Sequence, residues 1–303
     1  MINPHVSNET AKIKTVVFGL PNRGPVPSLE EAYDAKSYEA VQKGNYPSEQ
    51  AVIDEMSAVL NVFKKYNIEV LRPKQLDHYN QIFARDVSFV IDDTLFVANL
   101  ISDRGLETGA FEDIFKSVGD SLELMEAPIR AEGGDIILYN DILFVGTCKK
   151  ENFGKFKTTR TNYEAVEYLK SRFPHKHVIP IELKKCDTNP TKGILHLDCA
   201  FQPVGKDKAI IYTEGFENKS DAGLMQEIFG KNNLFEITPE EDYYMNTNIF
   251  SLSPDLVISE RNFKRLNTHL TKEWGIAVEE VPYAEISKMG GLLRCSTMPL
   301  VRE

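Results

Sequence analysis

The chain has 303 residues, enough for one large or two ordinary domains, and its 42% hydrophobic and 26% charged residues are typical of a folded globular protein. Forty-five acidic against thirty-five basic residues give a formal net charge of -10. This argues against a nucleic-acid binder, because phosphate contacts need clustered lysine and arginine. No apolar run approaches the ~18 residues of a membrane-spanning helix, and the start lacks a signal-peptide pattern. We therefore expect one cytoplasmic domain over residues 1–303, without a nucleic-acid or membrane partner.

The first predicted strand covers residues 12–20, where β-branched side chains favour extended structure. A proline- and glycine-rich loop follows over residues 21–27, and Ser28 then resembles a helix-capping residue followed by early carboxylates. A stronger helix begins near Ser48, because apolar residues recur there at helical spacing and two lysines favour its C-terminal end. Residues 68–71 predict a short second strand.

From there on the chain repeats a shape rather than a sequence. Four stretches predict hairpins, since each places turn residues between two β-rich arms. They cover residues 87–99, 135–146, 201–213 and 248–259. Helices are predicted over residues 111–118, 163–172, 222–229 and 262–274. With the N-terminal strand and helix, the count indicates an α/β fold of four or five strand-strand-helix-strand units, and recurring units of this kind often close around an axis.

Polar clusters stand at the entrances to successive hairpins. Asp86 precedes the first hairpin, and Glu132 lies before the second, separated from Asp135 by two glycines. His196 and Asp198 precede the third. If the units are equivalent around an axis, these strand entrances converge on one site.

The last segment supplies a candidate nucleophile. Gly290 and Gly291 let the backbone adopt conformations that other residues resist, and Cys295 follows between an arginine and two hydroxyl residues. A free thiol has a pKa of ~8.5, so a bound cation or a protonated histidine nearby raises its thiolate fraction at neutral pH. The other three cysteines form no CxxC pair and predict inert thiols rather than a zinc site or a disulfide framework. These are Cys148, Cys186 and Cys199.

A cysteine, a histidine and several carboxylates in one cleft suit attack on a cationic carbon. Carboxylates pair with a planar guanidinium through two parallel hydrogen bonds, each worth about 1.5–3 kcal/mol, whereas they would repel the oxyanion of an ester or peptide. Each candidate residue could instead have a purely structural role. His196 could be a hydrogen-bonded core histidine, Asp86 could pair with its neighbouring arginine, and Glu132–Asp135 could form a tight turn. His175 and His177 lack a third ligand and predict a surface loop rather than a metal site.

The order of these motifs resembles the guanidino-group-modifying enzyme superfamily, which contains arginine deiminases, dimethylarginine dimethylaminohydrolases and amidinotransferases. The resemblance runs from about Thr15 to the C-terminus. Its motifs are Phe-x-Arg-Asp at 83–86, Glu-Gly-Gly-Asp at 132–135, His-x-Asp at 196–198 and a glycine-led cysteine at 290–295. It implies a pentein fold, an α/β propeller of five strand-strand-helix-strand units around a pseudo-fivefold axis.

The resemblance also implies a role for each residue. Cys295 would add to the guanidinium carbon, and His196 would protonate the departing ammonia or amine and then act as the base for water. Asp86 and Asp198 would clamp the guanidinium nitrogens, and Glu132 would orient and charge-stabilise His196. Because the covalent thiouronium intermediate handles the electrophile, no cofactor and no metal is expected.

The resemblance does not identify the residue that binds the end of the substrate away from the guanidinium. Arg160, Arg104 and Arg294 are candidates for holding a substrate carboxylate, and Asp135 is a further candidate contact. The extra segment at residues 149–157 predicts either a lid with basic residues facing the substrate or a solvated loop. We also expect the loop at 21–27 and the stretch Glu30–Asp34 to cover the cleft, because they follow the first strand on the side of the other motifs.

Three functions remain in competition. The first is a hydrolase of arginine, a methylated arginine, citrulline or a similar guanidino or ureido compound. The second is an amidinotransferase, which uses the same residues and passes the amidino group to an amine; the chain length favours the hydrolase, since transferases of the superfamily tend to carry longer insertions. The third is an inactive pentein used as a binding module, which the retention of all motif residues disfavours. A homodimer is the candidate assembly.

Overall fold

The computed structural model describes residues 1–303, which form five three-stranded sheets. Four sheets follow one plan, in which two antiparallel strands form a hairpin and a third strand pairs in parallel with the second. Their strands are β3 (Ser88–Ile91), β4 (Thr94–Val97) and β5 (Leu122–Leu124); β6 (Ile136–Tyr139), β7 (Ile142–Thr147) and β8 (His177–Glu182); β9 (Phe201–Val204), β10 (Lys208–Ile211) and β11 (Leu234–Glu236); and β12 (Phe250–Ser253), β13 (Leu256–Glu260) and β14 (Ala277–Val281).

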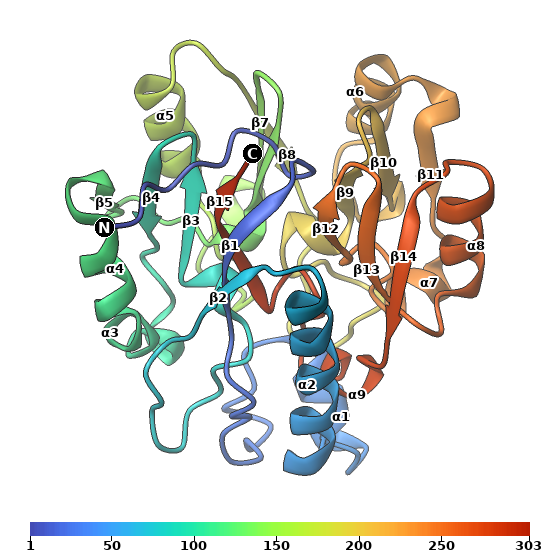
Figure 1. The fold of residues 1–303 in the computed structure, drawn as a ribbon. Coiled ribbons are helices and arrows are strands. Elements are labelled where there is room, and N and C mark those ends of the chain that lie inside the picture. The colour runs from blue at the N-terminus through green and yellow to red at the C-terminus, as the bar shows by residue number, and fades with distance from the viewer.

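The fifth sheet joins the two ends of the chain. The last strand, β15 (Thr297–Arg302), pairs antiparallel with β1 (Ile13–Phe18), and β1 pairs in parallel with β2 (Glu69–Leu71). Figure 1 shows the red C-terminal strand beside the blue N-terminal one. This sheet therefore repeats the plan of the other four, with its first strand supplied from the far end of the chain. The arrangement confirms the predicted pentein fold, an α/β propeller of five units.

Helices connect the second and third strands of each sheet and lie around the outside in Figure 1. These helices are α1 (Ala35–Gln42), α2 (Glu49–Lys65), α3 (Glu107–Ala110), α4 (Glu112–Val118), α5 (Tyr163–Arg172), α6 (Lys219–Phe229) and α8 (Lys264–Lys272). Two further short helices, α7 (Pro239–Tyr243) and α9 (Ala284–Ser287), precede β12 and β15. The four predicted hairpins and the helices between them are confirmed, with boundaries shifted by a few residues.

The helix α2 shows how the sequence holds a unit together. Ser48 caps it by accepting a hydrogen bond from the Ala51 backbone, and its apolar stripe is buried. Phe63 on that stripe packs edge-on against Phe18 of β1 and Phe250 of β12, with ring centroids 5.4 and 6.1 Å apart. A buried side chain of this size contributes about 1.5–3 kcal/mol. One helix face thus ties the terminal sheet to a neighbouring unit.

Three hairpins are preceded by one-turn 3₁₀ helices that pack against one another. They span Ala84–Asp86, Gly133–Asp135 and Leu197–Cys199. A substituent on Gly133 would lie 2.1 Å from the Arg85 carbonyl oxygen, so only glycine allows this approach. The entrances of successive units are therefore brought together, as the repeat predicted.

Ser28 does not begin a helix, so that prediction is wrong. The capping contacts are present, since the Glu31 backbone donates to Ser28 Oγ at 3.3 Å and the Ser28 backbone donates to Glu31 Oε2 at 2.9 Å. They close only a turn, and α1 begins later, with Asp34 as its N-cap. A capping pair specifies where a helix could start, but no amphipathic repeat follows directly to extend it.

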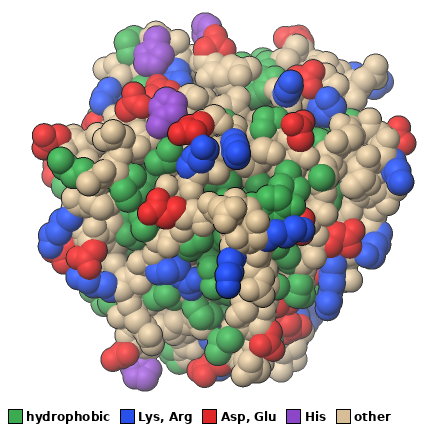
Figure 2. Space-filling view, viewed as in Figure 1, with side chains coloured by type: hydrophobic (Ala, Val, Ile, Leu, Met, Phe, Trp, Pro, Cys, Tyr) green, Lys and Arg blue, Asp and Glu red, His purple; other side chains and the backbone are tan.

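The surface carries side chains of both charges. Figure 2 shows acidic and basic groups interspersed over one face. Surface ion pairs such as Lys65–Glu279 and Arg172–Glu123 are screened by solvent and contribute little to stability. None of the helices combines the length and the apolar character that crossing a membrane requires.

Candidate functional site

Two clusters of buried polar side chains meet where the 3₁₀ turns pack together. One contains Asp86, Glu132 and His196, and the other contains Asp198, Cys199 and Cys295. In each cluster the potential ligand atoms lie within 4.8 Å of one another. Only Leu197 separates His196 from Asp198, so the two clusters form one continuous site. The atoms are close enough to hold a metal ion, although an arginine already occupies one oxygen of each carboxylate.

Cys295 is held by a residue that the sequence did not single out. Asn248 Nδ2 donates to Cys295 Sγ at 3.1 Å, while Asn248 Oδ1 accepts from the backbone N–H groups of Arg294 at 3.0 Å and Cys295 at 3.2 Å. Asn248 lies two residues before β12, as Asp86 lies two residues before β3. The unit repeat could therefore have identified it.

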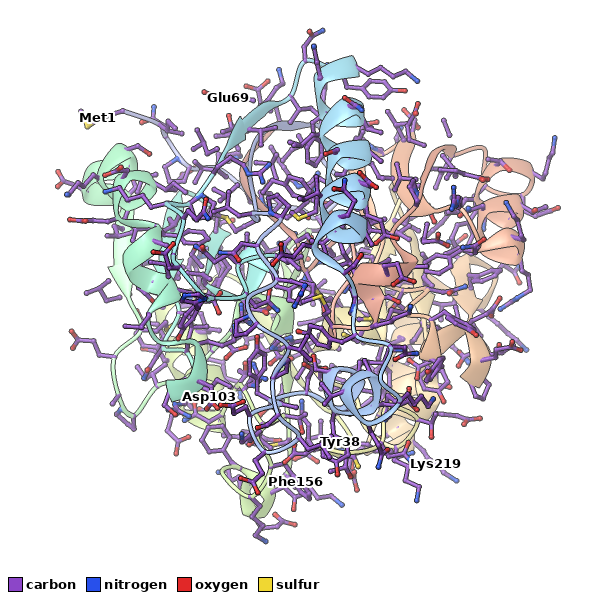
Figure 3. The ribbon with its side chains drawn as sticks, turned by 90° about the horizontal axis from the view of Figure 1, so that it is seen from below. Met1, Tyr38, Glu69, Asp103, Phe156 and Lys219 are labelled. Carbon is purple, nitrogen blue, oxygen red and sulfur yellow. The ribbon has the colours of Figure 1, made fainter.

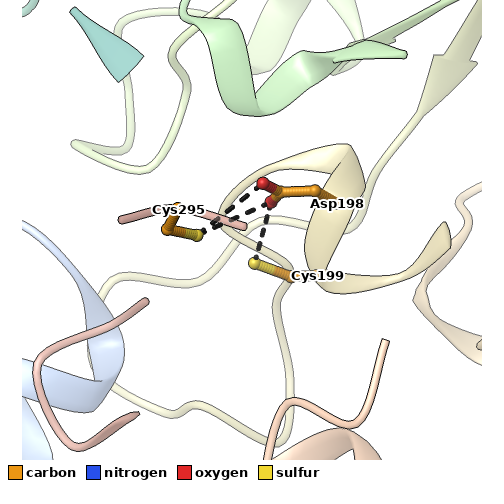
Figure 4. A group of neighbouring side chains, drawn as sticks. All are labelled: Asp198, Cys199 and Cys295. Atoms are coloured by element: carbon orange, nitrogen blue, oxygen red, sulfur yellow. Dashed lines mark hydrogen bonds between the residues drawn. The ribbon is translucent and has the colours of Figure 1, made fainter. Parts of the chain in front are cut away.

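The Cys295 thiol also lies 3.7 Å from the Asp198 carboxylate, and Figure 4 shows both sulfur atoms of its cluster directed toward that group. The neighbouring Cys199 thiol acts to lower the pKa of Cys295, but burial and the carboxylates of Asp198 and Asp86 outweigh it, so the pKa lies above its ordinary value. Without a bound cation, this thiol is therefore predominantly protonated at neutral pH.

His196 is fully buried, and its Nε2 lies 2.9 Å from Glu132 Oε2. Burial acts to lower the pKa of His196, yet the carboxylates of Asp86, Asp135 and Glu132 outweigh burial and raise the pKa above its ordinary value. The imidazolium form is thereby favoured. A Cβ on Gly134 would come within 2.7 Å of the His196 ring, so glycine is needed for the ring to sit here.

Asp135 fixes the backbone beside that histidine. Its Oδ1 accepts from the Leu197 backbone at 2.9 Å, and its Oδ2 accepts from Thr161 Oγ1 at 2.6 Å. Both oxygens are thus engaged within the protein. A contact between Asp135 and substrate stays a prediction, while the structure places Asp135 as a brace for the loop that carries His196.

The three candidate arginines all lie buried against carboxylates of the site. The pairs are Arg104–Asp86 at 2.5 Å, Arg160–Glu132 at 2.9 Å and Arg294–Asp198 at 2.9 Å. Each arginine contacts a single oxygen of its carboxylate. Asp86 Oδ1 and Glu132 Oε1 are left without a hydrogen-bond partner, as is His196 Nδ1. Contact between these arginines and a substrate carboxylate stays a prediction. Each guanidinium would have to bind the substrate while it keeps its ion pair with the protein carboxylate.

Two of these arginines are tied further into the protein by residues that no sequence motif marked. Glu107 holds Arg104 with hydrogen bonds of 2.7 and 2.8 Å, and Glu9 accepts from Arg294 Nη2 at 2.9 Å. Arg85, next to the predicted clamp, lies 4.0 Å from Glu9 as well. Buried arginines and carboxylates therefore alternate behind the reactive groups.

We call residues 21–42 the cover, and contacts of Tyr33 and Asp34 place its middle against this site, whereas coverage of the cleft by residues 21–27 stays a prediction. The Tyr33 carbonyl accepts from Arg160 Nη2 at 2.8 Å, and a Cβ on Gly290 would lie 2.4 Å from Asp34 Oδ1. Gly290 has φ +85°, a conformation that other residues rarely adopt. The expected covering stretch Glu30–Asp34 thus meets the glycine pair before Cys295.

The segment at residues 149–157 contacts the cover. Lys157 Nζ donates to the Glu30 carbonyl at 2.9 Å and lies 3.5 Å from Asp103. Figure 3 shows Asp103 and Phe156 on the same side of the molecule as Tyr38. Residues 149–157 are otherwise exposed or half-buried, so the choice between a lid with basic residues facing the substrate and a solvated loop stays a prediction.

A small pocket of about 40 Å³ opens between the cover and the site. Its wall includes Asp34 and Lys36 of the cover, together with Cys199 and Gly290 from the site. Asp242 and Tyr243 of α7 form the opposite side. Of Asp198, Cys199 and Cys295, Cys199 is therefore the member of the cluster that lines this pocket.

Comparisons with known proteins agree with this geometry. Residues 29–302 match the family model described as N,N dimethylarginine dimethylhydrolase, eukaryotic. The chain is 31% identical over 251 residues to the uncharacterized protein YkgA of Bacillus subtilis, covering 82% of this chain and 80% of that protein. It is 27% identical over 212 residues to an arginine deiminase of Listeria welshimeri, covering 59% of this chain but 49% of the deiminase, about half its length.

The fold is shared with solved structures at low sequence identity. SxtG, an amidinotransferase from Microseira wollei, superposes with a TM-score of 0.75 at 15% identity, covering 99% of this chain and 97% of that one. The match to the family model, supported by the ordered motifs and the five-unit fold, identifies a guanidino-modifying pentein enzyme. This chain belongs to the N,N dimethylarginine dimethylhydrolase family, within the guanidino-group-modifying pentein superfamily.

Proposed function

We propose that this protein is a cysteine-dependent hydrolase of a guanidino or ureido compound such as arginine, a methylated arginine or citrulline. One observation carries the proposal: in the buried cluster of Asp86, Glu132 and His196, the oxygens Asp86 Oδ1 and Glu132 Oε1 have no hydrogen-bond partner, and His196 Nδ1 lies 3.6 Å from Asp86 Oδ1. Buried polar groups are rarely left unsatisfied, so such atoms indicate a missing polar ligand. A guanidinium, with five N–H donors and a positive charge, supplies what these carboxylates lack.

The bound cation would also activate the nucleophile. Because burial and carboxylates hold the pKa of Cys295 above its ordinary value, a positive charge next to the thiol favours loss of its proton to solvent. The thiolate then adds to the central carbon, forming a C–S bond. Asp86 and Asp198 fix the planar substrate, with Arg104 and Arg294 behind them holding the carboxylates in place.

His196 serves the next two steps. As an imidazolium it protonates the leaving nitrogen while the C–N bond breaks, which leaves an S-alkylthiouronium on Cys295. Neutral His196 then accepts a proton from water as the water oxygen bonds to the same carbon. The C–S bond breaks last, releasing the ureido product. Glu132, 2.9 Å from Nε2, stabilises the charged form of the ring throughout.

An amidinotransferase would use the same first half-reaction and replace water by an amine. The closed setting supports the hydrolase, because His196 and Cys295 are 0% and 2% exposed beneath the cover. Water reaches such a position more readily than an amine that is itself a metabolite. The co-location of the nucleophile with an imidazolium and unsatisfied carboxylates also supports an enzyme over a binding module.

A product assay by mass spectrometry tests the proposal. The purified protein is incubated with arginine, methylated arginines, agmatine, guanidinoacetate and citrulline, each with and without glycine or ornithine. We expect ammonia or amine release without an acceptor. Cys295→Ala should abolish it, whereas Cys148→Ala, which changes a buried thiol outside both clusters, should retain it.

Two results would contradict the hydrolase. Product that forms only in the presence of glycine or ornithine would identify an amidinotransferase. The second result is the absence of product with every substrate, combined with a Cys295 that reacts with a haloacetamidine no faster than Cys148 does. This combination would identify a binding module.

A further inference from the structure

Cys199 is a second thiol beside the nucleophile, and the proposed reaction does not use it. The sulfurs of Cys199 and Cys295 and an oxygen of Asp198 all lie within 4.8 Å of one another. Cys199 Sγ donates to Asp198 Oδ1 at 3.5 Å, and Figure 4 shows the two thiols converging on this carboxylate from separate segments. Two reduced cysteines in such a position are a chemical pair rather than two isolated thiols.

This pair can be reached from the pocket. Cys199 lines the pocket below the cover, whereas Cys148 is buried and does not line it. Cys186 lines the same pocket but lies outside the cluster of Asp198, Cys199 and Cys295. A reagent as small as a peroxide that enters this pocket therefore meets the thiol that contacts the nucleophile.

We propose that Cys199 and Cys295 form an oxidative modification site, at which a peroxide converts the two thiols into a disulfide and reversibly blocks the nucleophile. The claim that turnover stops rests on the proposed function, while the disulfide itself does not. Closing the bond requires the sulfurs to move from within 4.8 Å to about 2 Å, a shift on the scale of side-chain rotation.

The local charges assign different roles to the two thiols. The neighbouring Cys295 thiol, burial and Asp198 raise the pKa of Cys199 well above its ordinary value. Burial and the carboxylates of Asp198 and Asp86 also hold the pKa of Cys295 above its ordinary value. Asn248 Nδ2 donates to Cys295 Sγ at 3.1 Å, a hydrogen bond that stabilises the thiolate, so Cys295 is the thiol that attacks peroxide and Cys199 is the resolving thiol.

The reaction balances in two steps. The Cys295 thiolate attacks a peroxide oxygen, so that an S–O bond forms, the O–O bond breaks and hydroxide departs as water after protonation. The Cys199 sulfur then attacks the Cys295 sulfenic acid, forming the S–S bond as the S–O bond breaks. Asp198 accepts the Cys199 proton and returns it to the departing hydroxide. Two thiols thus lose two electrons and two protons, and hydrogen peroxide is reduced to two waters.

The test treats the full chain with hydrogen peroxide. One portion is alkylated for intact mass and cross-linked peptides, and an unalkylated portion is assayed for activity before and after dithiothreitol. Wild type should take up two fewer alkyl groups than its untreated sample, yield a Cys199–Cys295 peptide and recover its activity. Cys199→Ser and Cys199→Ala should instead gain oxygen on Cys295 and recover at least ~10-fold less activity, each relative to its own untreated sample, because over-oxidation is irreversible. Cys186→Ser should behave as wild type.

Equal recovery in wild type and both Cys199 variants, or oxygen retained on Cys295 without a cross-linked peptide, would overturn the proposal. The mass and peptide readouts need no turnover, which separates this proposal from the hydrolase. If the Cys199–Cys295 disulfide forms in a protein that converts no guanidine, the modification site is supported and the hydrolase is not. If the protein turns over a substrate but forms no such disulfide, the hydrolase is supported and the modification site is not.

Discussion

The polar site and the cover meet at one pocket but are built differently. Asp86, Glu132 and His196 each stand where a hairpin begins, so strand pairing fixes their backbone. The cover belongs to none of the five sheets and is held by individual contacts, such as the hydrogen bond of 3.0 Å from Lys36 Nζ to the Tyr243 carbonyl. Substitutions in the site should therefore change chemistry and stability, and substitutions in the cover should change access.

The largest effect is expected where the site depends on a buried charge. Arg294→Met removes the ion-pair partner of buried Asp198 and leaves buried Glu9 with only the longer contact of 4.0 Å to Arg85. We expect the free energy of unfolding in urea to fall by about 3–5 kcal/mol. Arg265→Met removes an ion pair with Glu241 at the surface and should cost at most about 1 kcal/mol. Equal losses for the two variants would show that the arginine network behind the site is not a structural element.

A second substitution tests the electrostatics around the histidine. Glu132→Gln keeps the shape but removes a carboxylate that raises the pKa of His196. Since the first half-reaction needs protonated His196, lowering its pKa should move the alkaline limb of the kcat/KM profile to lower pH. Turnover at the optimum should fall about 10²-fold.

Its control is Glu107→Gln, which acts on Arg104 rather than on the imidazole directly and should move the limb less. If the alkaline limb of the kcat/KM profile is unchanged in Glu132→Gln, a group other than His196 determines that limb.

The third prediction concerns the asparagine that binds Cys295. Asn248→Ala removes the donor to Sγ and the acceptor for two backbone N–H groups. Leaving buried backbone donors unsatisfied costs about 1–3 kcal/mol, measurable by urea unfolding. Asn248→Asp keeps the acceptor but places a negative charge on the thiol, so it should be more stable than Asn248→Ala and yet show a higher pKa for Cys295 in alkylation rates. Identical alkylation profiles would remove Asn248 from the control of the thiol.

The same contrast explains what the sequence could predict. Hairpins and motif residues recur once per unit, so periodicity and turn chemistry located them, and the convergence of Asp86, Glu132 and His196 followed from the repeat. The partners of the three arginines depend on which side chains come together when the five units close around the axis. Glu9, for instance, pairs with Arg294 from the other end of the chain, and no local pattern marks that contact. Ser28 failed as a helix start because no amphipathic repeat follows its capping pair, and α1 begins later, after Asp34.

The smallest effects are expected at two helix caps, one inside the cover and one outside it. Asp34 accepts a hydrogen bond from the Ser37 backbone at 2.8 Å to cap α1, and Ser48 caps α2 through Ala51. Removing either cap by substitution with alanine should cost about 1 kcal/mol of stability. Only Asp34 lines the pocket, so Asp34→Ala should raise KM while leaving kcat within a few-fold, and Ser48→Ala should change neither. If both variants keep the wild-type KM, substrate does not pass beneath the cover, and the pocket beside Cys199 is then a route for smaller molecules such as peroxide.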